Sequence, residues 1–391
     1  MSERAATFDP RLGPPYYNQT HIAWRDSLRR FVEEELEPHV DEWDEAGDVP
    51  LEAHRKCAEF GLTGLGYPEE YGGYTEDIDL FHSLVSTQEL ARMGAGGVTT
   101  ALTTHVIGLP PVLAGGSPAL KQKVAPDVIA GKKIIALAIT EPSGGSDVAA
   151  LQTRAERKGD CYVVNGSKTF ISGGAKADFL TVAVRTGGAG ASGVSLMLME
   201  KGMPGFTSTL LKKQGWWASD TASLYFDDVE VPVENLIGDE DHGFRLTMNN
   251  FNSERLYLAA GAVSAARVCL EEATAWARER ETFGKRLAEH QVIRHKIAEM
   301  YRLVSASQAY LEQCVWRLQS GERPAADIAM AKVQATLTME FCAREASQIL
   351  GGASFIRGGK IERIYREVRV NAIGGGSEEI MRDLAARQLG I

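Results

Sequence analysis

The chain has 391 residues, a formal net charge of −10 at pH 7, and 44% hydrophobic and 24% charged residues. This length predicts two or three domains, and the composition is that of an ordinary globular protein rather than a disordered or fibrous one. It argues against a broad nucleic-acid surface, because phosphate binding needs clustered Lys and Arg, and the basic residues form only short pairs such as Lys132-Lys133.

The cysteines and the amino terminus indicate a reducing, intracellular setting. The five cysteines include no CxxC pair and no histidine at zinc-site spacing, so we expect free thiols and no metal. The first twenty residues, MSERAATFDPRLGPPYYNQT, have neither a signal-peptide core nor the composition of an organelle transit sequence. No segment is predicted to span a membrane. A cytoplasmic enzyme is the simplest expectation.

The first third of the chain has the spacing of helices. Apolar residues recur in threes and fours from Gln19 to about Leu120. Pro68 and the pair Gly72-Gly73 interrupt this pattern as turn signals. We expect several helices, in a first domain over 1–132.

Short β-branched and aromatic runs follow from about Lys133, among them KIIALAIT, DFLTVAVRT and VSLMLME. Asn165-Gly166, within CYVVNGSKTF, predicts a two-residue hairpin turn. We therefore expect a compact antiparallel β domain over 133–241. The loop RTGGAGASG contains a formal GxGxxG, but the strand-like VSLMLME follows it, so we reject a dinucleotide fingerprint.

The last part of the chain, 242–391, returns to helical spacing. Pro324 fits the first turn of a long helix that Gly351 and Gly352 could end. An earlier helix carries an apolar ladder along one face. Its members are Leu256, Ala259, Val263, Ala266, Leu270, Ala273 and Ala277.

Several stretches, in order, resemble one family. TEPSGGSD followed by NGSKTFISGG closely resembles the TEPxxGSD and NGxKxxIxxG segments of the acyl-CoA dehydrogenases, and ERETFGKRLAEHQ, QILGGASF and YREVRVNAIGGGSEEIM resemble later segments of the same family. The likeness runs from about residue 20 to the end. It implies an α+β fold with a helical amino-terminal domain, a central antiparallel β domain and a carboxyl-terminal four-helix bundle, usually as a homotetramer. It also implies FAD, an acyl-CoA substrate and an electron-transferring flavoprotein as acceptor.

The TEPSGGSD loop offers hydroxyls and glycine amides, which suit an isoalloxazine edge and a pyrophosphate, although a plain polar turn is the alternative. By the resemblance, Phe170 packs on the flavin in place of the commoner tryptophan, and Ser172, in place of threonine, bonds its redox-active nitrogen. The expected cofactor contacts are Leu137, Ile139, Thr140, Gly145, Ser146, Phe170, Ile171, Ser172, Arg280, Phe283, Gln291, Gln348, Gly351, Gly352, Ser377 and Glu378.

A second group of these contacts reaches the FAD of another subunit in the family. Arg280 and Gln291 match residues near the pyrophosphate, where an arginine fork suits phosphate oxygens, and Phe283 matches one near the adenine. An exposed charged helix end is the alternative for the Arg280 region, and an ordinary helix cap for Gly351-Gly352. If the resemblance holds, each FAD is held by two chains.

The catalytic base is missing from its usual place. The family removes a proton from the carbon next to the thioester, and most members use a glutamate in the terminal loop, where this chain has Gly375. A smaller branch, including isovaleryl-CoA and long-chain acyl-CoA dehydrogenases, places the glutamate at the start of the first carboxyl-domain helix, which here is Glu254. We expect Glu254 in a first turn, with its pKa raised by desolvation. A helix-dipole partner is the alternative role, and Glu378 and Glu379 are rival bases.

The substrate contacts rest on the same resemblance. Arg255 matches a residue beside the catalytic centre, and the amide of Gly375 would bond the thioester oxygen. The stretch 98–105 is the expected pocket floor, and a branched or medium- to long-chain acyl-CoA is the expected substrate, as in the similar bacterial citronellyl-CoA dehydrogenases. An oxidase, a flavin monooxygenase or an inactive assembly subunit on the same fold remains an alternative. The expected substrate-binding residues are Ser146, Phe251, Asn252, Arg255, Gly375 and Gly376.

Overall fold

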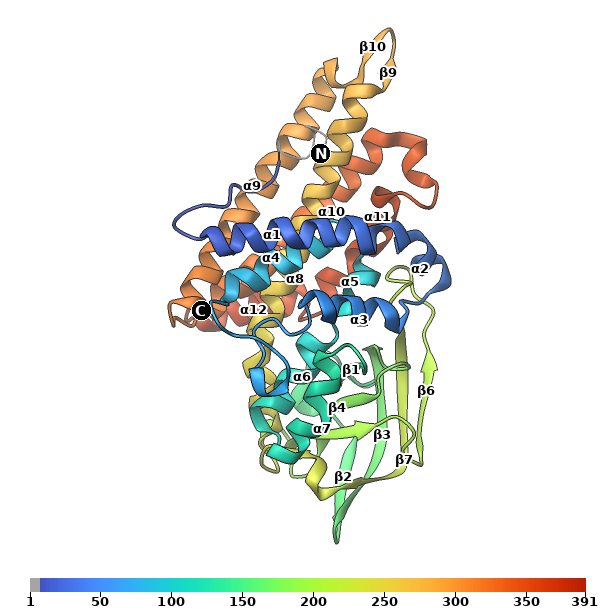
Figure 1. Ribbon diagram of the computed structural model, residues 1–391, viewed down its shortest axis with the longest axis vertical. Helices are drawn as coiled ribbons and strands as arrows, with labels where there is room; N and C mark the ends of the chain where they lie inside the picture. The colour runs from blue at the N-terminus through green and yellow to red at the C-terminus, as the bar shows by residue number, and fades with distance from the viewer. Residues whose placement is uncertain (1–7) are drawn as a thin grey trace. The chain divides into compact units, whose positions relative to one another are not determined.

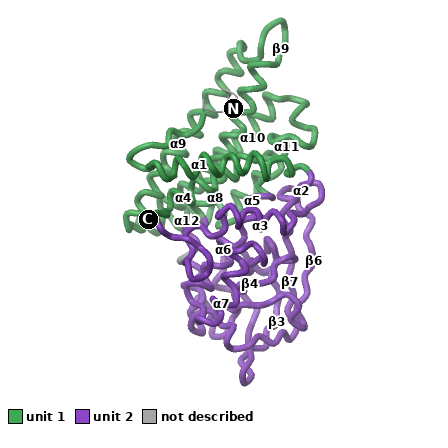
Figure 2. The backbone as a smooth tube through the Cα atoms, in the orientation of Figure 1, with its two compact units in different colours: residues 1–41, 77–96, 255–391 green, residues 42–76, 97–254 purple. Residues whose placement is uncertain are grey.

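The computed structural model describes residues 8–391, apart from the side chains at positions 249, 250 and 252. The first seven residues of the amino-terminal segment discussed above lie outside this description. Contacts group the chain into two compact units: unit 1 is formed by residues up to 41, 77–96 and 255–391, and unit 2 by 42–76 and 97–254 (Figure 2). The three domain ranges expected from sequence stay a prediction, because these units join segments that are distant along the chain.

Unit 1 is helical, and its helices begin and end at residues that favour such positions. Asn18 accepts hydrogen bonds from the amides of Thr20 and His21 and so starts the first helix at Gln19. As predicted, Pro324 lies at the start of a long helix, Ala325–Leu350, where it is the N-cap. Gly351 ends that helix with a φ of 62°. The main helices are α1 (Gln19–Phe31), α4 (Leu80–Ala91), α8 (Gly243–Glu279, in unit 1 from Arg255), α9 (Gln291–Gln319), α10 (Ala325–Leu350), α11 (Lys360–Ile373) and α12 (Glu378–Gln388) (Figure 1).

The predicted apolar ladder is the buried face of α8 in unit 1. Leu256 is 5% exposed and the six other members are fully buried. They pack with apolar residues of α9, α10 and α11 in one core. The three-and-four spacing in the sequence therefore identified the correct face of the helix.

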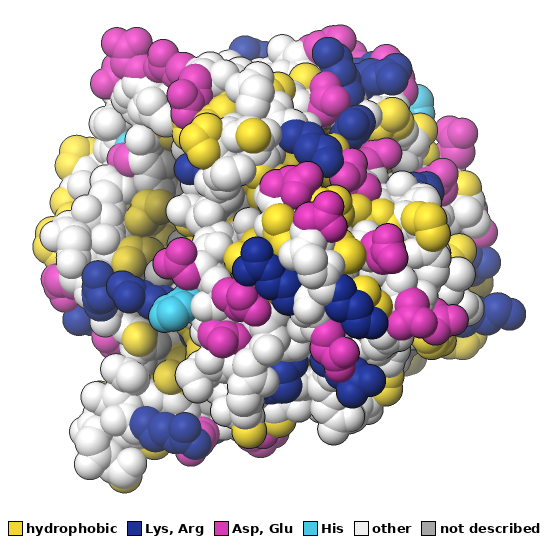
Figure 3. Space-filling view, turned by 90° about the horizontal axis from the view of Figure 1, so that it is seen from below, with side chains coloured by type: hydrophobic (Ala, Val, Ile, Leu, Met, Phe, Trp, Pro, Cys, Tyr) yellow, Lys and Arg dark blue, Asp and Glu magenta, His cyan; other side chains and the backbone are white. Residues whose placement is uncertain are grey.

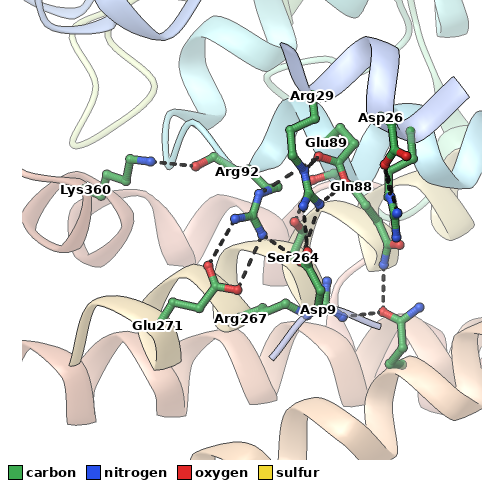
Figure 4. Close-up of polar contacts among 12 residues, drawn as sticks. Asp9, Asp26, Arg29, Gln88, Glu89, Arg92, Ser264, Arg267, Glu271 and Lys360 are labelled. Atoms are coloured by element: carbon green, nitrogen blue, oxygen red, sulfur yellow. Dashed lines mark hydrogen bonds and ion pairs between the residues drawn. The ribbon is translucent and has the colours of Figure 1, made fainter. Parts of the chain in front are cut away.

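A cluster of charged side chains ties α1, α4 and α8 together in unit 1 (Figure 4). Arg29 binds Asp9 at 2.6 Å and Glu89 at 2.7 Å, and Arg92 binds Asp9 at 3.2 Å and Glu271 at 3.3 Å. Each arginine thus meets two carboxylates, which offsets the cost of taking the charges out of water.

Unit 2 contains an eight-stranded sheet in the order β6-β7-β3-β2-β4-β5-β8, with β1 beside β4. Most neighbours are antiparallel as expected, but β1 runs parallel to β4, and β2 meets β4 in a single parallel pair. The expected antiparallel arrangement is therefore confirmed for most of the sheet, and the pairings of β4 with β1 and β2 are the exceptions. The strands are β1 (Ile135–Ala138), β2 (Arg154–Lys158), β3 (Cys161–Ser172), β4 (Phe179–Arg185), β5 (Val194–Glu200), β6 (Phe206–Leu210), β7 (Thr221–Pro232) and β8 (Leu236–Ile237).

The hairpin turn predicted at Asn165-Gly166 is wrong. The chain turns earlier, at Gly159-Asp160, where Lys158 pairs with Cys161, and β3 then runs unbroken. Gly166 instead lies at a register shift against β7, with a φ of 145°. A Cβ there would lie 2.7 Å from the Cα of Thr153. Glycine at this bulge therefore allows the backbone of Thr153 to pack closely against β3.

Helices also pack in unit 2. They are α2 (Val40–Ala46, in unit 2 from Glu42), α3 (Leu51–Phe60), α5 (Gly96–Thr103, in unit 2 from Gly97), α6 (His105–Gly115) and α7 (Pro118–Ile129). The Thr181 hydroxyl of β4 donates to the carbonyl of Gly108 at 2.8 Å, which ties α6 to the sheet. The GxGxxG loop ends in a short 3-10 turn and leads into β5, so rejecting a dinucleotide fingerprint was correct.

One stretch departs from the expectation that nothing could span a membrane. Residues Gly96–Gly115 are long and apolar enough by composition, and half of the apolar window is buried in the structure. The core helices of soluble proteins pass the same test, so this is weak evidence. Leu109 and Val112, both on this stretch, are fully buried in the core of unit 2.

The charges on the surface are mixed. On the face drawn in Figure 3, Lys and Arg side chains lie interspersed with Asp and Glu. This arrangement gives that face no extended basic field of the kind that binds nucleic acid.

Two buried histidines of unit 2 make stability sensitive to acid. Burial lowers the pKa of His54 to about 4, and burial followed by the charge of His54 lowers the pKa of His105 to about 4. The unfolded chain therefore takes up protons first as the pH falls from about 6.5 toward 4, and stability is lost across that window.

From pH 7 to pH 5 we expect each histidine to cost about 2 kcal/mol of unfolding free energy. Thermal unfolding at both pH values measures this loss. The double variant His54→Gln/His105→Gln should flatten the dependence, and an unchanged pH dependence in that variant would contradict the assignment.

Candidate active site

The TEPSGGSD loop follows β1 and exposes its backbone. Ile139 is buried in the unit 2 core and Leu137 packs against it, which anchors the strand end. The carbonyl of Thr140 accepts from the amide of Thr169 at 2.8 Å, so the loop lies beside β3. Gly145 and Ser146 are exposed, and a Cβ at Gly145 would meet only the Thr140 methyl, at 3.5 Å. The loop can therefore present amides and hydroxyls to a ligand.

A buried ion pair that sequence reasoning missed holds this loop. Lys168 is fully buried, and its Nζ donates to Glu141 at 2.8 Å and to the Ile139 carbonyl at 3.0 Å. Glu141 also accepts from the amides of Gln152 at 2.6 Å and Thr153 at 2.9 Å. Glu141 lies in the TEP motif and Lys168 in the NGSK motif. A charged residue of opposite sign in each motif was the sequence feature that could have indicated this ion pair.

The ion pair is charged on both sides at neutral pH. Burial lowers the pKa of Lys168 to about 8, although Glu141 opposes this shift. Burial raises the pKa of Glu141, but Lys168 and the two amides outweigh it, and the net shift is downward. The pair therefore fixes the start of the loop to the middle of β3.

Phe170 stands out from β3. It lies at the second register shift against β7, has a φ of 59°, and is 69% exposed. A left-handed backbone at an aromatic residue is uncommon and often marks a functional position. Ile171 next to it is buried, and Ser172 is half-buried opposite Thr221. The bulge thus presents an aromatic ring, with a hydroxyl two residues later.

Glu254 lies well inside α8, so the first-turn placement is wrong. The helix begins at Gly243, where a Cβ would lie 2.5 Å from the amide nitrogen of Leu196. Glu254 is eleven residues further on, or about three turns. Asparagines precede the apolar ladder in the sequence. Because asparagine is a poor helix former, the sequence did not indicate that the helix begins three turns before Glu254. This position excludes the alternative role of Glu254 as a partner of the helix dipole, because that effect is confined to the first turn of a helix.

Glu254 lies on α8 between apolar residues that pack in the core. Phe251, one turn earlier, packs against the unit 2 core, and Glu254 is half-buried. The side chain of Asn252 lies outside the described residues.

The terminal loop joins α11 to α12 in unit 1 and is built on glycine. Gly375 and Gly376 have φ of 66° and 106°, which side chains rarely adopt. The Nε of Arg255 donates to the Gly375 carbonyl at 3.3 Å. The structure thus brings together two of the predicted substrate-binding residues.

A side chain at Gly375 would need a left-handed backbone and a shift of the Leu258 side chain. A Cβ there would lie 2.4 Å from Cδ1 of Leu258. Leu258 follows Glu254 by four residues on α8, so both project from one face of that helix. Leu258 would have to move to admit a side chain at Gly375.

Glu378 and Glu379, the two other candidates for the catalytic base, lie in the first turn of α12. Ser377 is its N-cap, and Glu378 pairs with Arg382 at 2.9 Å. Hydrogen bonds from its own amide and from Ser377 lower the pKa of the exposed Glu379. A carboxylate with a lowered pKa is a weaker base, which disfavours Glu379 for proton removal.

The residues predicted for the phosphate and adenine lie exposed in unit 1. Arg280 follows α8 and opens a short hairpin of β9 (Glu281–Thr282) and β10 (Lys285–Arg286) (Figure 1). Phe283 in that turn is 96% exposed with a φ of 50°. Gln291 begins α9 and is exposed.

The QILGGASF segment is also open to solvent. Gln348 is exposed near the end of α10, and Gly351 and Gly352 have no atom within 4 Å of an added Cβ. Phe355, just beyond, is 90% exposed. Large apolar side chains left in solvent suggest a surface that a ligand or a partner covers.

A histidine cluster in unit 1 could hold a metal by distance, but its bonds favour a structural role. His21 Nε2 and His82 Nδ1 lie 2.8 Å and 3.0 Å from Oδ1 of Asp79. His21 Nδ1 accepts from the Asn18 amide at 3.0 Å, so its Nε2 carries the proton and donates to Asp79. Both nitrogens of His21 are thereby used, and the cluster fixes the starts of α1 and α4.

Comparison with known proteins identifies the class. Family models match residues 18–132, 136–229 and 241–390 as the amino-terminal, middle and carboxyl-terminal domains of acyl-CoA dehydrogenase. An acyl-CoA dehydrogenase of Emericella nidulans, apdG, is 38% identical over 97% of this chain and 92% of its own. The mitochondrial long-chain specific acyl-CoA dehydrogenase of Mus musculus is 35% identical over 95% and 87%. A probable acyl-CoA dehydrogenase structure from Mycobacterium abscessus aligns with a TM-score of 0.93 and 45% identity, covering 96% of this chain and all of that one.

The chain belongs to the acyl-CoA dehydrogenase family, whose members are FAD-dependent oxidoreductases. The residues present fit this cofactor. In unit 2, the exposed Phe170 ring and the open amide of Gly145 suit a flavin ring and a phosphate. In unit 1, Arg280 and the exposed Phe283 suit a phosphate and an adenine.

Proposed function

We propose that this enzyme removes the C2 proton of a branched or medium- to long-chain saturated acyl-CoA with Glu254 and forms the trans-2-enoyl thioester. The single observation that carries this assignment is the left-handed glycine at position 375, beside which the Leu258 side chain lies. At Gly375 the terminal loop has no side chain, its backbone is left-handed, and a Cβ there would lie 2.4 Å from Cδ1 of Leu258. The half-buried carboxylate of Glu254 projects from the helix face that also carries Leu258.

Bound FAD supplies the acceptor for the hydride that leaves the third carbon. Phe170 offers its exposed ring to one face of the flavin, and the Ser172 hydroxyl donates to the flavin edge. Thr140, Gly145 and Ser146 orient the cofactor by hydrogen bonds from the loop that the Glu141–Lys168 pair anchors. The remaining predicted contacts, Leu137, Ile139, Ile171, Ser377 and Glu378, line the cofactor.

The thioester is held by backbone and arginine groups. The amide of Gly375 bonds the thioester oxygen and stabilises the negative charge that develops there as the proton leaves. Arg255 donates to the Gly375 carbonyl and so orients the same turn. Ser146, Phe251 and Asn252 contact the CoA arm, and Gly376 adjoins the thioester.

The assembly proposed is a homotetramer in the cytoplasm. The exposure of Arg280, Phe283, Gln291 and Phe355 in a single chain supports a second subunit covering this region. In that arrangement these residues, with Gln348, Gly351 and Gly352, complete the cofactor site of a neighbour. An electron-transferring flavoprotein then reoxidises the reduced enzyme.

Anaerobic bleaching of the flavin absorbance by a series of acyl-CoA thioesters tests this function. We expect rapid bleaching by branched or longer saturated chains, slow recovery in air and fast recovery with an electron-transferring flavoprotein. Fast recovery in air alone would indicate an oxidase. A purified protein without a flavin band would indicate a binding or assembly role.

A further inference from the structure

A buried lysine lies beneath the terminal loop, outside every predicted contact. Lys332 on α10 is fully buried, and its ammonium donates to the Gly376 carbonyl at 2.8 Å and to the Ala372 carbonyl at 3.2 Å. Removing a lysine charge from water is costly, so a fully buried lysine calls for an explanation beyond surface charge.

The two acceptors belong to different parts of the loop. Ala372 lies in the last turn of α11, where carbonyls have no partner in the helix and a cation is favoured. Gly376 has a φ of 106° and adjoins Gly375, so this glycine pair has little conformational preference of its own. One ammonium therefore ties a rigid helix end to the flexible part of the turn.

Arg255 and Lys332 together fix two successive peptide planes. Arg255 takes the carbonyl of Gly375, and Lys332 takes the carbonyl of Gly376. In a trans peptide the carbonyl and the following amide point in opposite directions. Both planes follow directly after the amide of Gly375, so the two cations hold the chain on the carboxyl side of that amide, while the Lys332 bond to Ala372 holds it on the amino side.

We propose that Lys332 is a positioning residue that holds the glycine turn so that the amide of Gly375 meets the thioester oxygen of an acyl-CoA. The inference rests on the proposed function, since it needs the turn to bind that oxygen. Lys332 does not touch the substrate. Its two hydrogen bonds hold the turn on both sides of Gly375, at Ala372 and at Gly376.

The test uses the FAD-loaded enzyme and a 3-thia-acyl-CoA, which can lose its C2 proton but cannot complete dehydrogenation. The resulting enolate beside the flavin gives a long-wavelength charge-transfer absorbance. In Lys332→Met we expect this band to weaken about tenfold and kcat to fall about 100-fold, with KM changed less than about threefold, as for a displaced oxyanion donor. Lys332→Arg, which keeps charge and donors, should recover most of the band.

Thr336→Val is the matched control. Thr336 is buried one turn along α10, and its hydroxyl bonds the Lys332 and Val333 carbonyls rather than the loop. It should retain the wild-type band. If Lys332→Met does not fold, Lys332→Gln, a neutral and shorter donor, should show the same loss.

A wild-type band in a folded Lys332→Met or Lys332→Gln enzyme would overturn the inference. A wild-type enzyme that shows neither the band nor bleaching by any thioester would instead overturn the proposed function. The two failures are therefore distinguishable.

Discussion

Glu254→Gln is expected to lower turnover by about four orders of magnitude while leaving FAD and acyl-CoA binding nearly unchanged. The amide has almost the shape of the carboxylate but cannot accept the C2 proton. The glycine turn offers no equivalent group, because Gly375 has no side chain and its left-handed backbone disfavours one. Single-turnover flavin reduction, with the visible flavin spectrum and substrate affinity measured in parallel, separates chemistry from binding.

Glu378→Gln is the matched control for this experiment. Glu378 has the same side chain and follows the glycine turn, but it is occupied with Arg382 at the start of α12. The control should reduce its flavin at a rate within about tenfold of wild type, a loss far below that of a missing base. Normal turnover in Glu254→Gln together with an inactive Glu378→Gln would show that the base is in the loop.

Gly375→Glu is expected to fail to restore activity to Glu254→Gln, even though it puts a glutamate where most of the family carries one. Two obstacles act together. The left-handed backbone costs a side chain about 1–2 kcal/mol, and the new Cβ would lie 2.4 Å from Cδ1 of Leu258. We expect the double variant to stay within about tenfold of Glu254→Gln in flavin reduction, because the turn must distort to admit the glutamate.

Removing the obstruction should change that result. Adding Leu258→Ala frees the space and should raise the rate of flavin reduction about tenfold or more over the double variant. Gly374→Ala serves as the control for the turn, since Gly374 has an ordinary φ of −65° and its added Cβ meets only the Val370 carbonyl, at 3.2 Å. Full activity in Gly375→Glu/Glu254→Gln without Leu258→Ala would contradict the steric account.

Local spacing predicted the helices and most strands because their patterns extend over many residues. The α8 ladder is an example, and every member is buried. The hairpin turn was misplaced because Asn-Gly suits both a turn and a bulge. Only the folded sheet shows that Gly166 lies at a register shift against β7 and admits the Thr153 backbone beside β2.

The residues of the candidate site also fall into two groups, those that could be predicted from the sequence and those that could not. Residues inside recognisable motifs, such as Phe170 and Arg280, could be predicted by resemblance, and the structure adds their exposure and backbone conformation. Leu258 and Lys332 could not be predicted, because they lie outside the motifs and act through residues far away in the sequence. Lys168 lies inside a motif, but only the structure shows that it pairs with Glu141. A single sequence contains no record of such contacts.

The central claim is that the carboxylate on α8 removes the proton. Deuterium incorporation from D2O at C2 of the 3-thia-acyl-CoA, followed by mass spectrometry, measures that step apart from hydride transfer. We expect exchange in the wild type and in Glu378→Gln, and its loss in Glu254→Gln. Exchange that persists in Glu254→Gln and disappears in Glu378→Gln would contradict the account.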